Sequence, residues 1–192
     1  MIQCENLSRE ELCTIGQEIA DAFLAENGCF TVLSREAAGR MFTSIVEICY
    51  RTGHLYTTGP GREGFCAYWT KKERPGIREQ LRFGLHLVTS MSLRQSMALA
   101  NSQTNWLPTE KRYKKREDFV EVFLLAVRKE YQGQGYFRKM LEEPFQLAKQ
   151  RGTICVLDTD SQWKADKYCH VGMHIVDQKT QKSGITMFAL EK

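Results

Sequence analysis

Apolar residues recur every three or four positions in two segments near the N-terminus, and this spacing predicts two amphipathic helices. The first helix is expected from Ser8 to about Ala25, with Ser8 as its N-cap and Glu11 at the capping-box position. The second is expected to begin at Ser34 and to end at Gly53. Both helices should bury one stripe against a common core.

The next part of the chain combines a short hairpin with a long helical stretch. Apolar runs at 54–58 and 65–70 flank the turn-rich stretch 59–61, which predicts two antiparallel strands. Residues from Pro75 to about Asn105 then show helical spacing again, and we expect two helices joined near residues 90–92. No chemical motif stands out in this insertion.

The C-terminal half begins with the strongest strand signal. Residues 118–127 are mostly apolar without clean alternation, as expected of a central strand buried on both faces. A helix over 136–151, a strand over 155–159 and a short helix over 162–171 follow. A closing hairpin over 174–177 and 186–190 completes the chain. No repeat or linker interrupts residues 1–192, which predicts a single α/β domain.

Composition fits an ordinary globular protein. Hydrophobic residues make up 42% and charged residues 26% of the 192 residues. The net charge of +4 is spread over both halves and gives no reason to expect a nucleic-acid partner. The densest basic run, 111–116, is interpreted as a solvated loop, with the rim of a site for an anionic cofactor as the alternative.

Other bulk features bear on the compartment. No apolar run approaches the roughly 20 residues of a membrane span, and the start lacks the pattern of a secretory signal. The seven cysteines include no CxxC pair, which argues against a disulfide framework. We therefore expect a cytoplasmic protein without a membrane partner. The oligomeric state is not readable from the sequence.

The stretch Gln132-Gly133-Gln134-Gly135 lies between the strand that ends at Val127 and the helix that begins at Tyr136. Glycines in such a turn leave backbone N–H groups accessible to a phosphate and can adopt positive φ. The helix N-terminus adds unsatisfied donors and a favourable dipole. This geometry predicts a pyrophosphate site, although glycines before a helix are often only turn chemistry.

Residues 125–135 resemble the acetyl-CoA signature of the GNAT superfamily of N-acetyltransferases, (Gln/Arg)-x-x-Gly-x-(Gly/Ala). Its first position is Gln132 and its fourth is Gly135, whereas the sixth, Phe137, departs from the small residue expected. The apolar stripe of the helix favours a core position for that ring.

The resemblance continues downstream. Leu157-Asp158-Thr159 and the later stretch from Tyr168 to Met173 look like the Leu-Glu-Thr strand end and the Tyr-x-x-x-Gly-Phe helix end of the superfamily. The overall layout is similar to the puromycin N-acetyltransferase-like branch. Lys164 stands where that branch usually has an asparagine.

This resemblance implies a largely antiparallel, mixed sheet with a splayed pair of strands, flanked by helices, and acetyl-CoA as co-substrate. Backbone groups at Leu125 and Val127 would bond the acyl and pantetheine amides, and residues 133–138 would bind the pyrophosphate. Ser161 could reach the pantetheine arm or cap the short helix. The implied cofactor contacts are Leu125, Ala126, Val127, Gln132, Gly133, Gln134, Gly135, Tyr136, Phe137, Arg138 and Ser161.

Two residues are candidates for catalysis. Tyr168 matches the tyrosine that protonates the leaving thiolate in many members, with a half-buried helix tyrosine as the alternative. Glu121 is the only charged residue in its apolar run, and counting by twos places it on one face with Phe123, Leu125 and Val127. It matches the catalytic glutamate of the histone-acetylating branch and is a candidate general base, with a solvent-facing carboxylate as the alternative.

The resemblance implies an N-acetyltransferase that acts on the primary amine of a small molecule. Acetylation of a protein or peptide amine is the second hypothesis. A non-catalytic acyl-CoA-binding module is the third, favoured by Phe137 and Lys164. No histidine or cysteine has partners at metal-ligand spacing, so no metal is expected.

Overall fold

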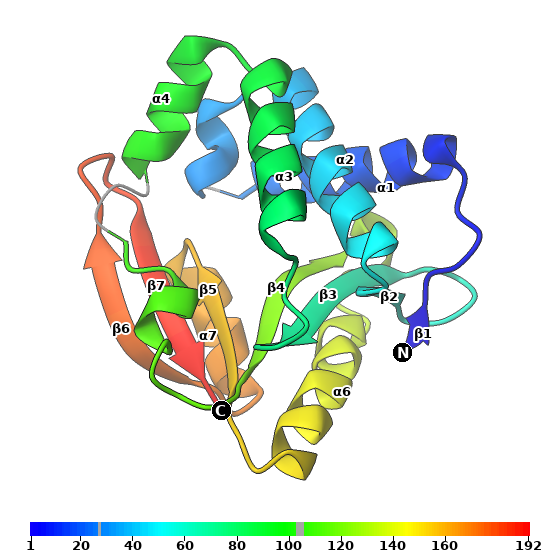
Figure 1. Ribbon diagram of the computed structural model, residues 1–192, viewed down its shortest axis with the longest axis vertical. Helices are drawn as coiled ribbons and strands as arrows, with labels where there is room; N and C mark the ends of the chain where they lie inside the picture. The colour runs from blue at the N-terminus through cyan, green and yellow to red at the C-terminus, as the bar shows by residue number, and fades with distance from the viewer. Residues whose placement is uncertain (27, 103–105) are drawn as a thin grey trace.

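The computed structural model describes residues 1–26, 28–102 and 106–192 (Figure 1). Its sheet has seven strands in the order β1-β2-β3-β4-β5-β7-β6. The strands are β1 (Ile2–Gln3), β2 (Leu55–Thr57), β3 (Gly64–Thr70), β4 (Val120–Val127), β5 (Cys155–Thr159), β6 (His174–Thr180) and β7 (Thr186–Glu191). The helices are α1 (Arg9–Leu24), α2 (Arg35–Arg51), α3 (Ile77–Ser90), α4 (Leu93–Ser102), α5 (Thr109–Arg112), α6 (Tyr136–Gln150) and α7 (Gln162–His170), with 3₁₀ turns η1 (Cys29–Val32) and η2 (Lys129–Tyr131).

The two N-terminal helices begin where the sequence predicts. Ser8 accepts a hydrogen bond from the Glu11 N–H (3.2 Å), and the Glu11 carboxylate accepts one from the Ser8 N–H (2.8 Å), which completes the capping box. Ser34 caps α2 with its side chain alone, which accepts from the Ala37 N–H (3.2 Å). These bonds satisfy donors that would otherwise be unpaired at the helix ends.

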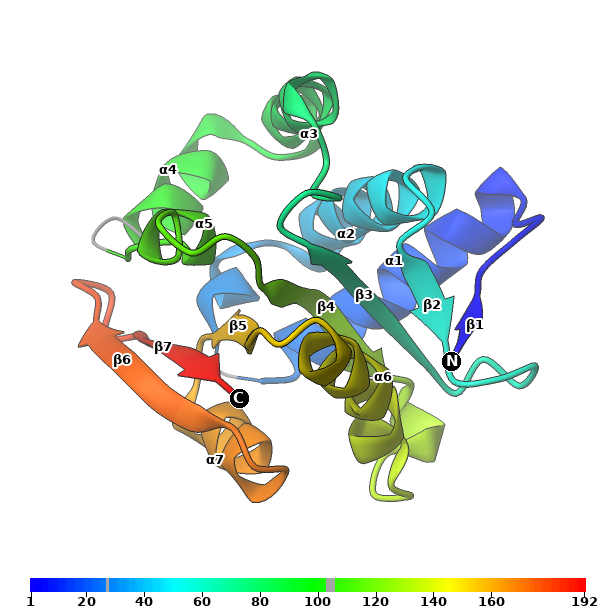
Figure 2. The same ribbon diagram turned by 60° about the horizontal axis from the view of Figure 1, so that its bottom comes forward.

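The helices cover the sheet on both faces (Figure 2). Helices α1 and α2 pack on one face, in a cluster that includes Phe42, Trp69 and Leu124. Helices α6 and α7 pack on the other face, where Met140 and Ala165 join a second cluster. Full burial of a side chain such as Phe42 contributes about 1.5–3 kcal/mol. The sheet is therefore the middle layer of the fold.

A β-bulge in the middle of β4 corrects the expected grouping of its side chains. Trp69 lies opposite Glu121, and Ala67 lies opposite Leu124, so Phe123 is the extra residue. An extra residue reverses the alternation of the strand. Glu121 consequently shares the face of Leu124, and Leu125 packs with the opposite cluster. Counting by twos was wrong here because it assumes an unbroken period.

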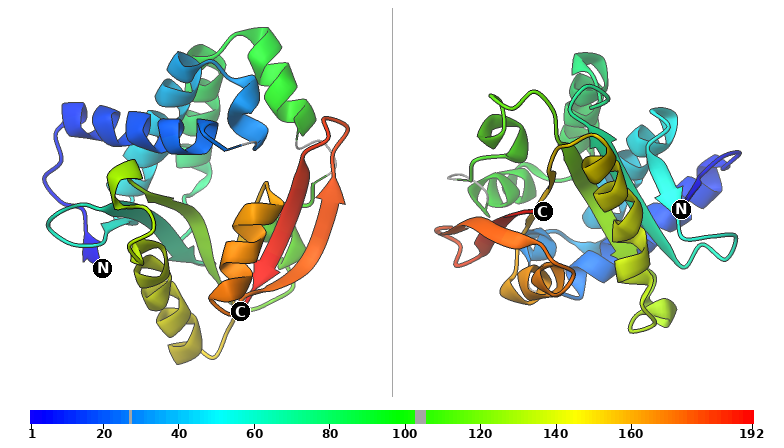
Figure 3. Two further views of the ribbon diagram at one scale, coloured as in Figure 1. Left: turned by 180° about the vertical axis from the view of Figure 1, so that it is seen from behind. Right: turned by 90° about the horizontal axis from the view of Figure 1, so that it is seen from below.

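Strands β4 and β5 form the parallel, splayed pair that was predicted. They pair only through Val120 with Cys155 and Glu121 with Val156. Beyond this point the strands diverge, as Figure 1 shows. We call the space between the diverging parts of β4 and β5 the opening. Seen from behind, α6 and α7 lie on either side of it (Figure 3). The remaining neighbouring strands are antiparallel, so the mixed, largely antiparallel sheet is confirmed.

The insertion contains the two expected helices, α3 and α4, and its expected end at Asn105 lies outside the described residues. Phe83 and Leu87 of α3 pack against the cluster that holds α2. The basic run is not wholly a loop, because Lys111 and Arg112 end the short helix α5. Among the described residues, no helix combines the length and the apolar character that a membrane crossing requires.

Candidate functional site

A cavity of about 800 Å³ occupies the opening between β4 and β5. Residues from both faces of the sheet and from both ends of the chain line it. It is lined by Ala22, Phe23, Glu26, Cys29, Phe30, Phe42, Ile45, Arg74, Trp106, Pro108, residues 121–127, Tyr131, Gln132, Gly133, residues 135–138, Asp158, Thr159, Asp160, Trp163, Lys164, Lys167, Tyr168, His170, Val171 and Met187. The cavity brings together most of the residues that the motifs singled out.

The turn before α6 presents a set of backbone donors at one end of this cavity. Gly133 (φ 78°) and Gly135 (φ 86°) adopt the left-handed conformation. Counting onward from Gly133, the first N–H group that donates to a backbone carbonyl is that of Lys139, which bonds Gly135 (3.2 Å). Within the described part of the chain, the N–H groups of residues 133–138 therefore have no backbone acceptor. No protein atom lies within 4 Å of a Cβ built on either glycine. The turn can therefore receive an anion.

The side chains around this turn divide into two groups. Gln132 and Gln134 donate back to the carbonyls of Val127 (3.2 Å) and Glu130 (3.0 Å), which fixes the loop on itself. Gln134 is not among the residues that line the cavity, whereas Arg138 is, and Arg138 is exposed. An exposed guanidinium beside free N–H groups strengthens the anion site.

The inner edge of β4 offers further hydrogen-bonding groups. The Arg128 N–H donates to the Glu63 carbonyl beside β3 (3.0 Å). Because backbone groups alternate along a strand, those of Ala126 also face β3, and those of Leu125 and the N–H of Val127 face the opening. Since β5 does not pair with this part of β4, Leu125 remains available to a ligand amide. Ala126 contributes only its side chain.

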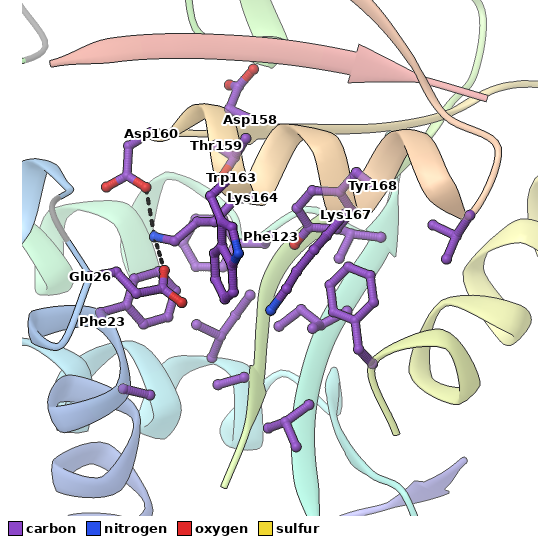
Figure 4. A pocket seen from close by; sticks show the side chains of 18 of the residues that line it. Phe23, Glu26, Phe123, Asp158, Thr159, Asp160, Trp163, Lys164, Lys167 and Tyr168 are labelled. Atoms are coloured by element: carbon purple, nitrogen blue, oxygen red, sulfur yellow. Dashed lines mark hydrogen bonds and ion pairs between the residues drawn. The ribbon is translucent and has the colours of Figure 1, made fainter. Parts of the chain in front are cut away.

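Tyr168 and Phe137 form one wall of the cavity, from α7 and α6. Their ring centroids lie 5.0 Å apart. Phe137 thus packs against Tyr168 and the second core cluster, as its position on the apolar stripe predicted. Burial raises the pKa of Tyr168 well above its usual value, so its hydroxyl stays protonated. Figure 4 shows Tyr168 beside Lys167 on the cavity side of α7.

Glu121 is buried, and its carboxylate contacts Trp69 of β3 and Arg74 in the segment after β3. It accepts a hydrogen bond from the indole Nε1 of Trp69 (2.8 Å) and forms an ion pair with Arg74 Nε (2.9 Å). The solvent-facing alternative is therefore excluded, because Glu121 is 7% exposed.

Lys164 has a structural role that its sequence did not reveal. Its ammonium lies 2.7 Å from an Asp160 oxygen and 2.9 Å from a Glu26 oxygen, and it contacts the ring of Phe23. Figure 4 shows the nitrogen between the two carboxylates. The only earlier signal was the replacement of the expected asparagine.

Two other residues of the β5–α7 segment hold local structure. Asp158 accepts hydrogen bonds from the N–H (3.3 Å) and hydroxyl (2.8 Å) of Thr109 and so attaches α5, and burial raises its pKa. Ser161 caps α7 through the Lys164 N–H (3.3 Å) and is not among the residues that line the cavity. The pantetheine contact of Ser161 stays a prediction. Among the described residues, no cluster of His, Cys, Asp and Glu could hold a metal.

No protein-family model matches the chain, and no curated protein matches its sequence. Solved structures match it over almost its whole length. Arylalkylamine N-acetyltransferase 2 from Aedes aegypti superposes with a TM-score of 0.59 at 13% identity, over 98% of this chain and 96% of that chain. An N-acetyltransferase from Staphylococcus aureus Mu50 gives 0.58 at 16%, over 100% and 98%.

The C-terminal condensation domain of Ebony, in complex with beta-alanyl-dopamine, is also similar, with a TM-score of 0.60 at 10% identity over 97% of this chain and 95% of that chain. At such identities the likeness shows a shared fold. It does not support the specific branch that the layout suggested.

Proposed function

The chain has the fold of the GNAT superfamily of N-acetyltransferases, as its motifs predicted, and we propose that it transfers an acetyl group from acetyl-CoA to the primary amine of a small molecule. One observation carries this proposal. The opening between β4 and β5 joins an anion site at the turn before α6 to free backbone groups on the inner edge of β4.

The arrangement fits the chemistry of acetyl-CoA. The N–H groups of residues 133–138 and Arg138 would bind the pyrophosphate, and Gln132 would hold the turn in shape. Leu125 and the N–H of Val127 would bond the amides of the pantetheine arm. The thioester would then lie in the opening beside Tyr168. The glycines leave room for the phosphates to approach the backbone.

The reaction needs a neutral amine, a stabilised carbonyl oxygen and a protonated leaving group. The amine nitrogen forms a bond to the acetyl carbon, the carbon–sulfur bond breaks, and the thiolate takes a proton. Tyr168 would give that proton, because it lines the opening and its hydroxyl stays protonated. The backbone groups of Leu125 would orient the acyl end.

Glu121 would remove the proton of the amine, directly or through a water molecule. It lines the cavity on the α1–α2 side of β4, on the face opposite to Leu125. Trp69 and Arg74 fix its orientation. Because Glu121 lies on the face opposite to Leu125, a relay through water fits its position better than direct contact.

The test begins with binding and continues with turnover. Isothermal titration with acetyl-CoA is expected to show one site, and release of free thiol should require an added amine. Turnover with small amines supports the proposed acceptor. Turnover only with peptides would support protein acetylation, and binding without thiol release would identify an acyl-CoA-binding module. Absence of binding would refute the proposal.

A further inference from the structure

The Lys164 cluster lies at the end of the cavity away from the turn before α6. Its members come from α7, from the end of β5 and from the segment after α1. Glu26, Asp160 and Lys164 all line the cavity. In Figure 4 the cluster is on the α1 side, and α6 is on the opposite side. It therefore belongs to the part of the cavity that an acceptor would occupy.

Asp160 is held in place independently of the lysine. Asp160 accepts a hydrogen bond from the Cys29 N–H (2.8 Å), and its side chain is 6% exposed. A Cβ on Gly28 would lie 2.1 Å from the Asp160 carboxylate, so this turn fits closely around it. Glu26 is attached to the same turn and keeps 29% exposure. A cation site is thus built into the wall.

Lys164 supplies the cation for this site. Burial disfavours its charge, but Asp160 and Glu26 outweigh that effect and raise its pKa above the usual value. Lys164 correspondingly helps to lower the pKa of Asp160, against the effect of burial. The pair is therefore ionised, and the ammonium occupies the position that an external ammonium group would take.

We propose that Lys164 fills, from within, a dicarboxylate subsite for a second cationic group of the acceptor, so that this protein acetylates monoamines with an apolar or aromatic body and rejects diamines and polyamines. The specificity for acceptors rests on the proposed acetyltransferase function. The filled subsite itself rests only on the contacts of Lys164.

The rest of this end of the cavity suits such an acceptor. Phe123 is 46% exposed and Trp163 is 54% exposed, and both line the cavity. Lys167 lies over the Trp163 ring, 3.2 Å from its centroid, and has no carboxylate within ion-pair distance among the described residues. A second positive charge on an acceptor would meet Lys167 without a free carboxylate from Glu26 or Asp160 to bind it.

The first experiment compares acceptors. For the unmodified protein, kcat/KM with 2-phenylethylamine or tryptamine should exceed that with putrescine or agmatine by at least about tenfold, equivalent to about 1.4 kcal/mol. Lys164→Met keeps the apolar stem and removes the charge. This variant should shift the ratio of diamine to monoamine turnover by at least about tenfold toward the diamine. An equal preference in the unmodified protein would overturn the specificity.

The second experiment needs no catalysis. Putrescine should raise the Tm of Lys164→Met in a saturable manner, because its ammonium replaces the missing one, and should leave the unmodified protein unchanged. Lys167→Met is the matched control on the same helix, and it should gain no stabilisation, because it uncovers no carboxylate pair. Adding Glu26→Gln to Lys164→Met should weaken the effect.

The outcomes separate this inference from the proposed function. An inactive protein whose Lys164→Met variant is stabilised by putrescine would refute the acetyltransferase and keep the subsite. An active protein whose variant gains neither stability nor diamine turnover would refute the subsite and keep the enzyme. A variant that stays unfolded at every putrescine concentration also contradicts the subsite.

Discussion

At the scale of single residues, the neighbours of a side chain decide its chemistry. Tyr168 shows this, because it packs against Phe137 and the second core cluster and is only partly exposed. Burial disfavours the phenolate, so the pKa rises and the hydroxyl is a proton donor across the physiological range. The same residue in solvent would ionise near its ordinary pKa of about 10.

We therefore expect Tyr168→Phe to lower kcat by about 10²-fold or more, because the phenyl ring keeps the packing and loses the proton. The dissociation constant for acetyl-CoA should stay within about threefold, since the ring itself remains. Because the pKa of Tyr168 is raised, the rate of the unmodified enzyme should not fall on account of this group up to about pH 10. A falling limb near pH 8 that disappears in the variant would contradict the assignment.

Glu121 is the second test at this scale. Glu121→Gln keeps an oxygen that can accept from Trp69 and removes the charge that pairs with Arg74. We expect kcat/KM to fall by about 10²-fold or more if Glu121 accepts the proton. Trp69→Phe is the control, because it loses the hydrogen bond and leaves the carboxylate. Unchanged kcat/KM across the pH range in Glu121→Gln would remove the residue from the mechanism.

At the scale of elements, the turn before α6 is the feature that sequence and structure share most closely. Positive φ at Gly133 and Gly135 gives the turn its shape, and the space above both glycines is open. The role of the two glycines in binding can therefore be tested without disturbing the core, because no protein side chain occupies that space.

Gly135→Ala should raise the Kd of acetyl-CoA by roughly tenfold or more, or about 1.4 kcal/mol, because the methyl group would lie where the phosphate approaches. It should also cost about 1–2 kcal/mol of stability, since φ is 86°. Gly152→Ala is the matched control, because Gly152 also has positive φ (62°) and open space but lies beyond the end of α6. Urea unfolding should show that both variants are destabilised equally. Titration calorimetry should show a loss of affinity for acetyl-CoA only in Gly135→Ala.

The sequence predicts the elements well and their fine register poorly. Periodicity and caps place helices such as α1 and α2, because these signals are local. The bulge at Phe123 was not predictable, since a continuous apolar run has no polar–apolar alternation that an extra residue would interrupt. The role of Lys164 was also hidden. It depends on Glu26 and Asp160, which lie far from each other in the chain and meet only in the folded protein.

At the scale of the whole molecule, the sheet consists of two parts joined by a short seam. Strands β1–β4 form one part and β5–β7 the other, and Val120 and Glu121 carry the pairing between them. Helices α1 and α2 pack with the first part and α7 with β6 and β7, whereas α6 contacts β3, β4 and β5 and so packs on both parts. The second core cluster also spans both parts, and the Lys164 cluster adds a further link, because it ties the segment after α1 to α7.

A ligand in the opening should therefore act as a further link between the two parts. At a concentration of about 100 times Kd, acetyl-CoA should stabilise the fold by about 2.7 kcal/mol and raise Tm accordingly. Amide hydrogen exchange should slow at Leu125, at Val127 and in residues 133–138, which have no backbone acceptors now. Gly135→Ala at the same concentration should show less protection. Slower exchange confined to α3 and α4 would instead place the ligand outside the opening, because none of the described side chains of these helices lines it.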